Sequence, residues 1–235
     1  MTAGQVDGIL KRDRGYEREI RLWVIAGCII ICMRFIVRIR LFGLRGLNGD
    51  DYTMILTCFI WVGSFIVLDL IYRCGTNLDL TADQIRILSD EEVLRLVRGS
   101  KFQLMAWYLY SAQLWSMKAS VLLFYKRLTF GLWRHARFLT YLTWLTILSY
   151  LAIVSTITFG CLPYHHNWGV RPLPSDRCLF KIQNLLVTTS FNIITDMAIL
   201  SLPIPALKTM RLPAYKKMFR EKKQDYDELK SKVRL

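Results

Sequence analysis

Residues 102–125 read FQLMAWYLYSAQLWSMKASVLLFY and are bounded by Lys101 on one side and by Lys126 and Arg127 on the other. This 24-residue stretch contains one charged side chain, that of Lys118. As an α-helix rising about 1.5 Å per residue, it is long enough for the roughly 30 Å hydrocarbon core of a bilayer. We therefore predict a transmembrane helix here. Further stretches of the same kind make a helix buried in a soluble protein the weaker interpretation.

Lys118 is the most informative residue of this stretch. It lies about 12 Å from the basic end of the helix, near the limit from which an ammonium group reaches the headgroups. A lysine inside a span costs on the order of 3 kcal/mol, so we expect it to face the bundle interior and to find a partner there. Snorkelling or a structural ion pair is the simplest explanation. A ligand-binding or proton-handling role and a retinal Schiff base are the alternatives that remain open.

The composition of the chain agrees with a membrane protein. Of its 235 residues 53% are hydrophobic, and the mean hydropathy is +0.28, which disfavours a soluble globule. The net charge of +14 would suit nucleic-acid binding, but the basic residues lie between the apolar stretches and at the C-terminus. Positive flanks of membrane spans explain this arrangement better, and we expect no nucleic-acid partner.

The apolar stretches predict an all-α integral membrane helix bundle with five transmembrane helices. A signal peptide is the alternative for the first stretch, but arginines follow its apolar part where a cleavage site should lie. In the longest connection, Thr81 can cap a partly amphipathic helix at about 82–98. The five predicted spans cover about residues 20–41, 52–72, 102–125, 138–160 and 183–202.

Polar residues inside these spans form a candidate buried polar site made of Arg34, Lys118, Asn192 and Asp196. Asp196 lies about 9 Å from the end of the fifth span and is the best candidate partner for Lys118 or Arg34. A structural salt bridge is the simplest interpretation, and an ion- or ligand-binding site is the more specific alternative. No nucleophile triad or phosphate-binding loop suggests catalytic residues.

Two carboxylates, Asp50 and Asp51, open the second span. Carboxylates at a helix N-terminus accept hydrogen bonds from free N–H groups and complement the helix dipole, which is enough to account for them. Arg38, near the end of the first span, is expected to extend to the membrane interface.

Three of the six cysteines lie at or near the ends of apolar runs. We favour a disulfide between Cys161 and Cys178, in the loop 161–182 that we expect to be ordered and non-helical, although Cys74 leaves two other pairings open. A disulfide predicts a non-cytosolic face. Because no Cys-x-x-Cys pair is present, we expect no metal and no cofactor. The other three, which we expect to be packing residues, are Cys28, Cys32 and Cys58.

The distribution of lysine and arginine predicts the orientation. With five spans, the side that receives the C-terminus carries more basic residues, so we expect an extracellular N-terminus (1–19), a transmembrane domain (20–205) and a basic cytosolic tail (206–235). The protein is then a multi-pass protein of the plasma membrane or an endomembrane.

Five short motifs, in order along the chain, resemble those of the fungal rhodopsin-domain integral membrane proteins, which are receptor-like proteins with seven helices. The resemblance implies a rhodopsin-like domain. The chain departs from the family at residues 73–77, where RCGTN replaces a Gly-x-Gly-x-His stretch, and we expect helices six and seven to be lacking. The residues that carry the resemblance are Arg34 and Arg38; Asp50, Asp51 and Tyr52; Lys118, Ser120, Leu122, Leu123, Phe124, Tyr125, Arg127 and Leu128; Cys161, Pro163, Trp168 and Cys178; and Asn192, Asp196, Leu202, Pro203, Ile204 and Pro205.

The resemblance implies a receptor-like integral membrane protein of fungi with an unknown ligand. The expected partners are the lipid bilayer, a small apolar ligand and a cytosolic G protein. The alternative is a membrane-bound accessory protein or enzyme, such as a cyclase, of a secondary-metabolite pathway, in which Asp196 and Lys118 act on an apolar intermediate. A truncated chain without function is the third hypothesis.

Overall fold

The computed structural model describes residues 14–43, 49–128 and 133–202, and in these ranges the chain forms helices and no strand. The long helices are α2 (Arg14–Phe42), α3 (Gly49–Cys74), α5 (Asp90–Leu128), α6 (Trp133–Phe159) and α8 (Ile182–Leu200). The short ones are α4 (Ala82–Ile87), the 3-10 helix η2 (Tyr164–Trp168) and α7 (Asp176–Phe180).

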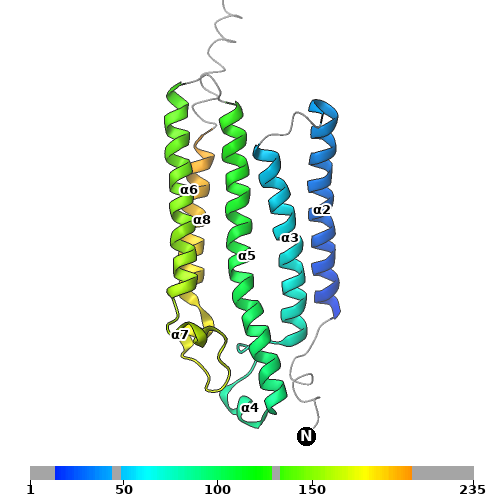
Figure 1. The fold of residues 1–235 in the computed structure, drawn as a ribbon, viewed down its shortest axis with the longest axis vertical. Helices are drawn as coiled ribbons and strands as arrows, with labels where there is room; N and C mark the ends of the chain where they lie inside the picture. Colours follow the sequence, from blue (N-terminus) through cyan, green and yellow to red (C-terminus); the bar gives the residue numbers. More distant parts are fainter. Residues whose placement is uncertain (1–13, 44–48, 129–132, 203–235) are drawn as a thin grey trace, which may run out of the picture.

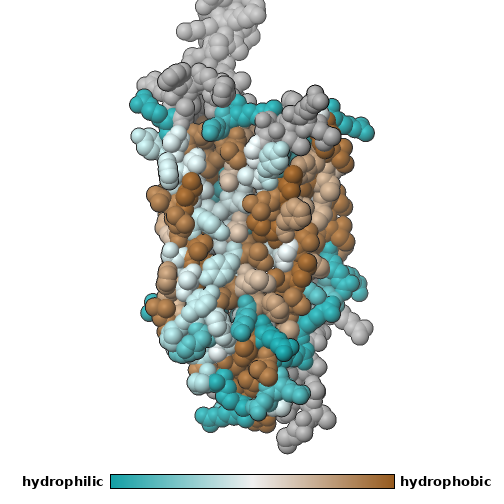
Figure 2. Space-filling view, in the orientation of Figure 1, coloured by the Kyte–Doolittle hydropathy of each residue, from teal (hydrophilic) through white to brown (hydrophobic). Residues whose placement is uncertain are grey.

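The long helices stand side by side in one bundle (Figure 1). Helix α3 lies between α2 and α5 and packs along both, and α6 packs against α5 and α8 on the other side. The short helices gather at one end, in segments 75–89 and 160–181, which we call the lid. Figure 2 shows hydrophobic residues over the middle of the bundle and hydrophilic residues at its two ends, the distribution that a bilayer-spanning protein requires.

Within the described residues, three helices are long and apolar enough to cross a membrane, namely Glu17–Arg40, Gly49–Cys74 and Arg137–Phe159. They correspond to the first, second and fourth predicted spans. The third and fifth predicted spans lie in α5 and α8, whose polar side chains lower their hydropathy. Length and hydropathy therefore confirm a helical membrane protein, but they do not confirm the count of five spans.

The helix predicted at 82–98 does begin at Ala82 after Thr81, as expected, but its predicted end was wrong. The chain breaks after α4 at Leu88, which has an extended conformation, and α5 then runs without interruption through Lys101 to the end of the third predicted span. Ser89 and Glu92 cause the new start, because the Ser89 N–H donates to Glu92 Oε2 (3.0 Å) and the Glu92 N–H donates to Ser89 Oγ (3.4 Å). This is a capping box, and it satisfies donors that a helix start leaves free.

The backbones of α3 and α5 approach each other closely at the end of α3. Gly75 terminates α3 with a φ of 75°, which favours glycine, and its N–H donates to the carbonyl of Ile71 (2.8 Å). Its own carbonyl lies against Gly99 of α5, where a Cβ would meet that oxygen at 1.7 Å. Gly99 therefore allows the two backbones to touch.

The predicted disulfide between Cys161 and Cys178 is present, with a Cα–Cα distance of 5.3 Å, and Cys74 is free. The loop that it closes was expected to be non-helical, and this was wrong, because the loop contains the helical turns η2 and α7. Arg171 ties this loop to the end of α4 by donating to the carbonyls of Ile85 (2.6 Å) and Leu88 (3.1 Å).

A small apolar core and a few polar contacts join the lid to the bundle. Asn77 donates from its side chain to the carbonyl of Gly169 (3.0 Å) and from its backbone to Ser100 Oγ of α5 (2.9 Å). Burial lowers the pKa of Lys181 to about 8, and its amine lies 3.4 Å from the carbonyl of Asn167. The lid is thus a packed cap over one end of the bundle. Its core consists of Leu80, Ile85, Leu88, Leu96 and Val170.

We predict that Gly99→Ala destabilises the protein, because its Cβ would collide with a backbone carbonyl and separate α3 from α5. Overpacking of this kind costs about 1–3 kcal/mol or more. The matched control is Gly63→Ala in α3, where an added Cβ meets nothing within 4 Å and helix propensity favours alanine by about 1 kcal/mol. Thermal unfolding in detergent should show a lower midpoint for the first variant only; equal midpoints would contradict the close approach.

Candidate functional site

The four residues of the candidate buried polar site do not form one site. The structure brings Lys118, Asn192 and Asp196 together between α5 and α8, whereas Arg34 lies at the junction of α2, α3 and α5 beside Asp50. The described part of the bundle therefore holds two separate charge clusters. We call them the α5–α8 pair and the α2–α3 junction.

The α5–α8 pair consists of Lys118 and Asp196. The Lys118 amine forms an ion pair with Asp196 Oδ1 and lies 3.3 Å from the backbone carbonyl of Asn192, which accepts a second hydrogen bond. The ammonium also lies 5.4 Å from the centre of the Trp115 ring, a cation–π distance. Asp196 was the expected partner for Lys118 or Arg34, and the structure selects Lys118.

Helical spacing explains how these groups meet. Trp115 and Lys118 are three residues apart on α5, so they share one face. The Trp115 indole N–H donates to the carbonyl of Thr146 (3.0 Å) and to Ser149 Oγ (3.0 Å) of α6, which holds the ring in place. The lysine is therefore positioned by three helices together.

The two partners of the pair differ in exposure. The side chain of Lys118 is 6% exposed and that of Asp196 is 48% exposed. A buried ammonium without its counter-charge is strongly unfavourable in a low-dielectric interior. Asp196 consequently neutralises Lys118 while it keeps one side open to a group approaching α8.

The centre of the α2–α3 junction consists of Arg38, Asp50 and Asp51, and Arg34 lies at its edge, 3.8 Å from Asp50 Oδ2. Arg38 Nη2 lies 2.9 Å from Asp50 Oδ2 and Arg38 Nε lies 3.1 Å from Asp51 Oδ1, so one guanidinium bridges both carboxylates. Both aspartates are 2% exposed. Ser120 of α5 lies 3.4 Å from the backbone carbonyl of Asp50, which connects the junction to a third helix.

The sequence interpretation of this junction was incomplete. Arg38 was expected to extend to the membrane interface, but its side chain is only 13% exposed, because the carboxylates of α3 hold it inside. The two aspartates do open a helix, as expected, and they also need a cation because they are buried. The signal was present in the sequence: an arginine closes one helix and two aspartates open the next, across a short connection.

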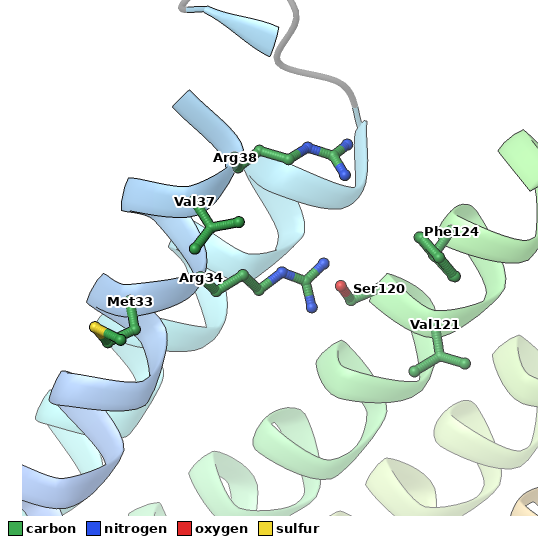
Figure 3. A pocket seen from close by; sticks show the side chains of 7 residues that line it. All are labelled: Met33, Arg34, Val37, Arg38, Ser120, Val121 and Phe124. Carbon is green, nitrogen blue, oxygen red and sulfur yellow. The ribbon is translucent and has the colours of Figure 1, made fainter. Parts of the chain in front are cut away.

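A pocket of about 540 Å³ lies beside the junction. Its lining comes from α2 and α5, and Figure 3 shows the Arg34 guanidinium pointing from α2 toward Ser120 on α5. The lining residues are Met33, Arg34, Val37, Arg38, Ser120, Val121 and Phe124.

We predict an energetic coupling between Lys118 and Asp196. Lys118→Met and Asp196→Asn should each lower the thermal midpoint in detergent, the second more strongly because it leaves the buried ammonium without a counter-charge. The double variant should recover part of the loss, since the effects of substitutions at two residues in contact do not add. Strict additivity in this double-mutant cycle would show that the pair contributes nothing to stability.

We predict that Arg38→Met reduces the yield of folded protein, because it leaves two buried carboxylates unpaired; breaking a buried pair costs about 3–5 kcal/mol. Arg38→Lys should be intermediate, because a single ammonium lacks the fork that reaches both aspartates. The monodisperse fraction in size-exclusion chromatography measures the effect. Arg86→Met, at an exposed position of α4, is the control, and a similar yield for Arg38→Met would contradict the bridging role.

Comparison with known proteins gives one match. Neither the curated proteins nor the solved structures contain a match to this chain. A family model described as the fungal rhodopsin domain matches residues 33–219, a range that includes both charge clusters and the disulfide. Because this match covers most of the chain, and the motifs of the first subsection point to the same family, the protein belongs to the fungal rhodopsin domain family.

Proposed function

We propose that the chain is a receptor-like integral membrane protein of a fungus, and that it binds a small, largely apolar ligand. The single observation that carries the proposal is the family match over residues 33–219, which covers α3 to α8 and the last part of α2. The apolar helices and the hydrophobic band of Figure 2 support a bilayer as its environment.

In the proposed topology five helices cross the bilayer. Figure 1 supports this count, because α5 and α8 run alongside α6 in one bundle and would share its depth in the membrane. The N-terminus (1–19) and the lid with its disulfide face the outside, the transmembrane domain covers 20–205, and the basic tail (206–235) lies in the cytosol. An N-terminal epitope tag should be labelled on intact cells, and labelling only after permeabilisation would reverse the orientation.

The α5–α8 pair is the proposed point of ligand action. Asp196 is half exposed, whereas Lys118 is buried and held by Trp115 and Asn192. A ligand that offers its own charge or hydrogen bond to Asp196 would weaken the pair and change the packing of α5 on α8. A ligand shifts such an equilibrium only through different affinities for the two states, which this exchange of partners supplies.

The basic end of the bundle is the proposed cytosolic contact. The last turn of α5 carries Lys126 and Arg127, and a cytosolic G protein with an acidic surface is the partner that this charge suits. The mutual neutralisation of Lys118 and Asp196 supports a receptor over the cyclase-like enzyme, because neither group is then a free acid or base.

The proposal predicts that a ligand is bound and returned unchanged. The full chain in nanodiscs would be exposed to fractionated organic extracts of fungal culture medium, and fractions that raise its thermal midpoint would be retained. The compound released by heat should have the mass and retention time of the one applied, and Lys118→Met/Asp196→Asn should lose the stabilisation. A released compound of altered mass would support the enzyme and contradict the receptor.

A further inference from the structure

The pocket beside the α2–α3 junction combines two kinds of surface. Its residues lie one helical turn apart on α2 and on α5, so each helix contributes one continuous face (Figure 3). One part of the lining is hydrocarbon, and the other is the guanidinium of Arg34. A ligand that fits both parts has an anionic head and an apolar chain.

The apolar part of the pocket is accessible from outside the bundle. Met33 and Val37 of α2 are 58% and 52% exposed, and Val121 and Phe124 of α5 are 41% and 43% exposed. In a membrane protein such surface contacts acyl chains. A hydrocarbon chain that lies between the two helices would contact all four side chains.

The cationic part of the pocket is Arg34, whose side chain is 38% exposed. It lies 3.8 Å from Asp50 Oδ2, whereas Arg38 lies 2.9 Å from the same oxygen, so Arg38 is the principal counter-ion of Asp50. A guanidinium has five N–H donors in a planar fork. One contact at 3.8 Å leaves donors for a further anion, and phosphate and carboxylate groups match this fork in two-point contacts.

The position of the pocket along the helix axis suits a lipid headgroup. The Arg34 guanidinium is level with the first turn of α3, since it approaches Asp50, the second residue of that helix. Basic residues occupy the last turns of the neighbouring helices at this end, Arg40 in α2 and Lys126 and Arg127 in α5. Basic pockets between membrane helices near a charged leaflet attract anionic headgroups.

We propose that this pocket is a binding site for an anionic phospholipid of the adjacent leaflet. Arg34 pairs with the headgroup anion, and one acyl chain lies on Met33, Val37, Val121 and Phe124. The site is separate from the α5–α8 pair, and it requires a membrane environment but no signalling. The assignment of this leaflet to the cytosolic side rests on the proposed orientation.

The test uses the purified full chain in detergent, titrated with dioleoyl phosphatidylserine and with dioleoyl phosphatidylcholine, and followed by native mass spectrometry. Wild-type protein should bind phosphatidylserine more tightly. Arg34→Gln should weaken phosphatidylserine binding by about tenfold or more, the value of a charge-assisted hydrogen bond, and should leave phosphatidylcholine binding unchanged. Equal affinities of the wild-type protein for the two lipids, or an unchanged phosphatidylserine affinity in Arg34→Gln, would overturn the proposal.

A second variant tests the pocket without touching the arginine. Val121→Trp fills the space at an exposed position and should reduce phosphatidylserine binding even if Arg34→Gln fails to fold, whereas unchanged binding would place the lipid elsewhere. Arg86→Gln on α4, in the lid, should bind like the wild type, and a comparable loss there would point to a non-specific charge effect and overturn the site. Sodium oleate distinguishes the source of the anion: phosphatidylserine should bind more tightly than oleate, and tighter binding of oleate would identify the occupant as a free anionic amphiphile and overturn the phospholipid assignment.

Discussion

Two buried carboxylates at the start of α3 need a counter-charge, and Arg38 of α2 supplies it. The position of α2 in the bundle depends on this contact, because the remaining surface of the helix is largely apolar and exposed. Apolar side chains in lipid carry no directional preference, so they do not determine which face of α2 meets α3. The ion pairs select that face. At mid-helix the close fit of Gly27 against Trp61 supports the same choice, since a Cβ there would lie 2.7 Å from the indole nitrogen.

Helix α5 connects the two ends of the bundle. Near the lid, Ser100 accepts a hydrogen bond from Asn77 and Gly99 touches the end of α3. Near the opposite end, Lys118 binds Asp196 and Ser120 contacts the start of α3. A single uninterrupted helix therefore carries contacts to the lid and to both charge clusters.

The two charge clusters suit different tasks because their burial differs. At the α2–α3 junction both carboxylates are almost fully inaccessible, so they are in contact only with the helices that enclose them. In the α5–α8 pair only the lysine is buried, and the carboxylate has an open side. A carboxylate that is paired but still partly exposed can be contacted by a ligand. A ligand cannot replace either partner of an ion pair that is fully enclosed. Arg34 resembles the second case, since it is partly exposed beside a pocket with an apolar wall.

The sequence by itself determined the helical class and the apolar stretches, and it predicted a partner for Lys118 inside the bundle. These follow from composition along one segment and from the cost of an isolated charge in hydrocarbon. The sequence also favoured the Cys161–Cys178 disulfide, which the structure then selected over the two pairings with Cys74. Only the tertiary structure decided that Asp196 pairs with Lys118 while Arg34 lies beside Asp50, and that Arg38 turns inward. It also divided the predicted 82–98 helix at Leu88 and joined the second part to the third span, where a capping box that amphipathic periodicity does not reveal starts α5. The physical reason is that pairing depends on the rotation and relative height of neighbouring helices, and contacts between distant segments set both.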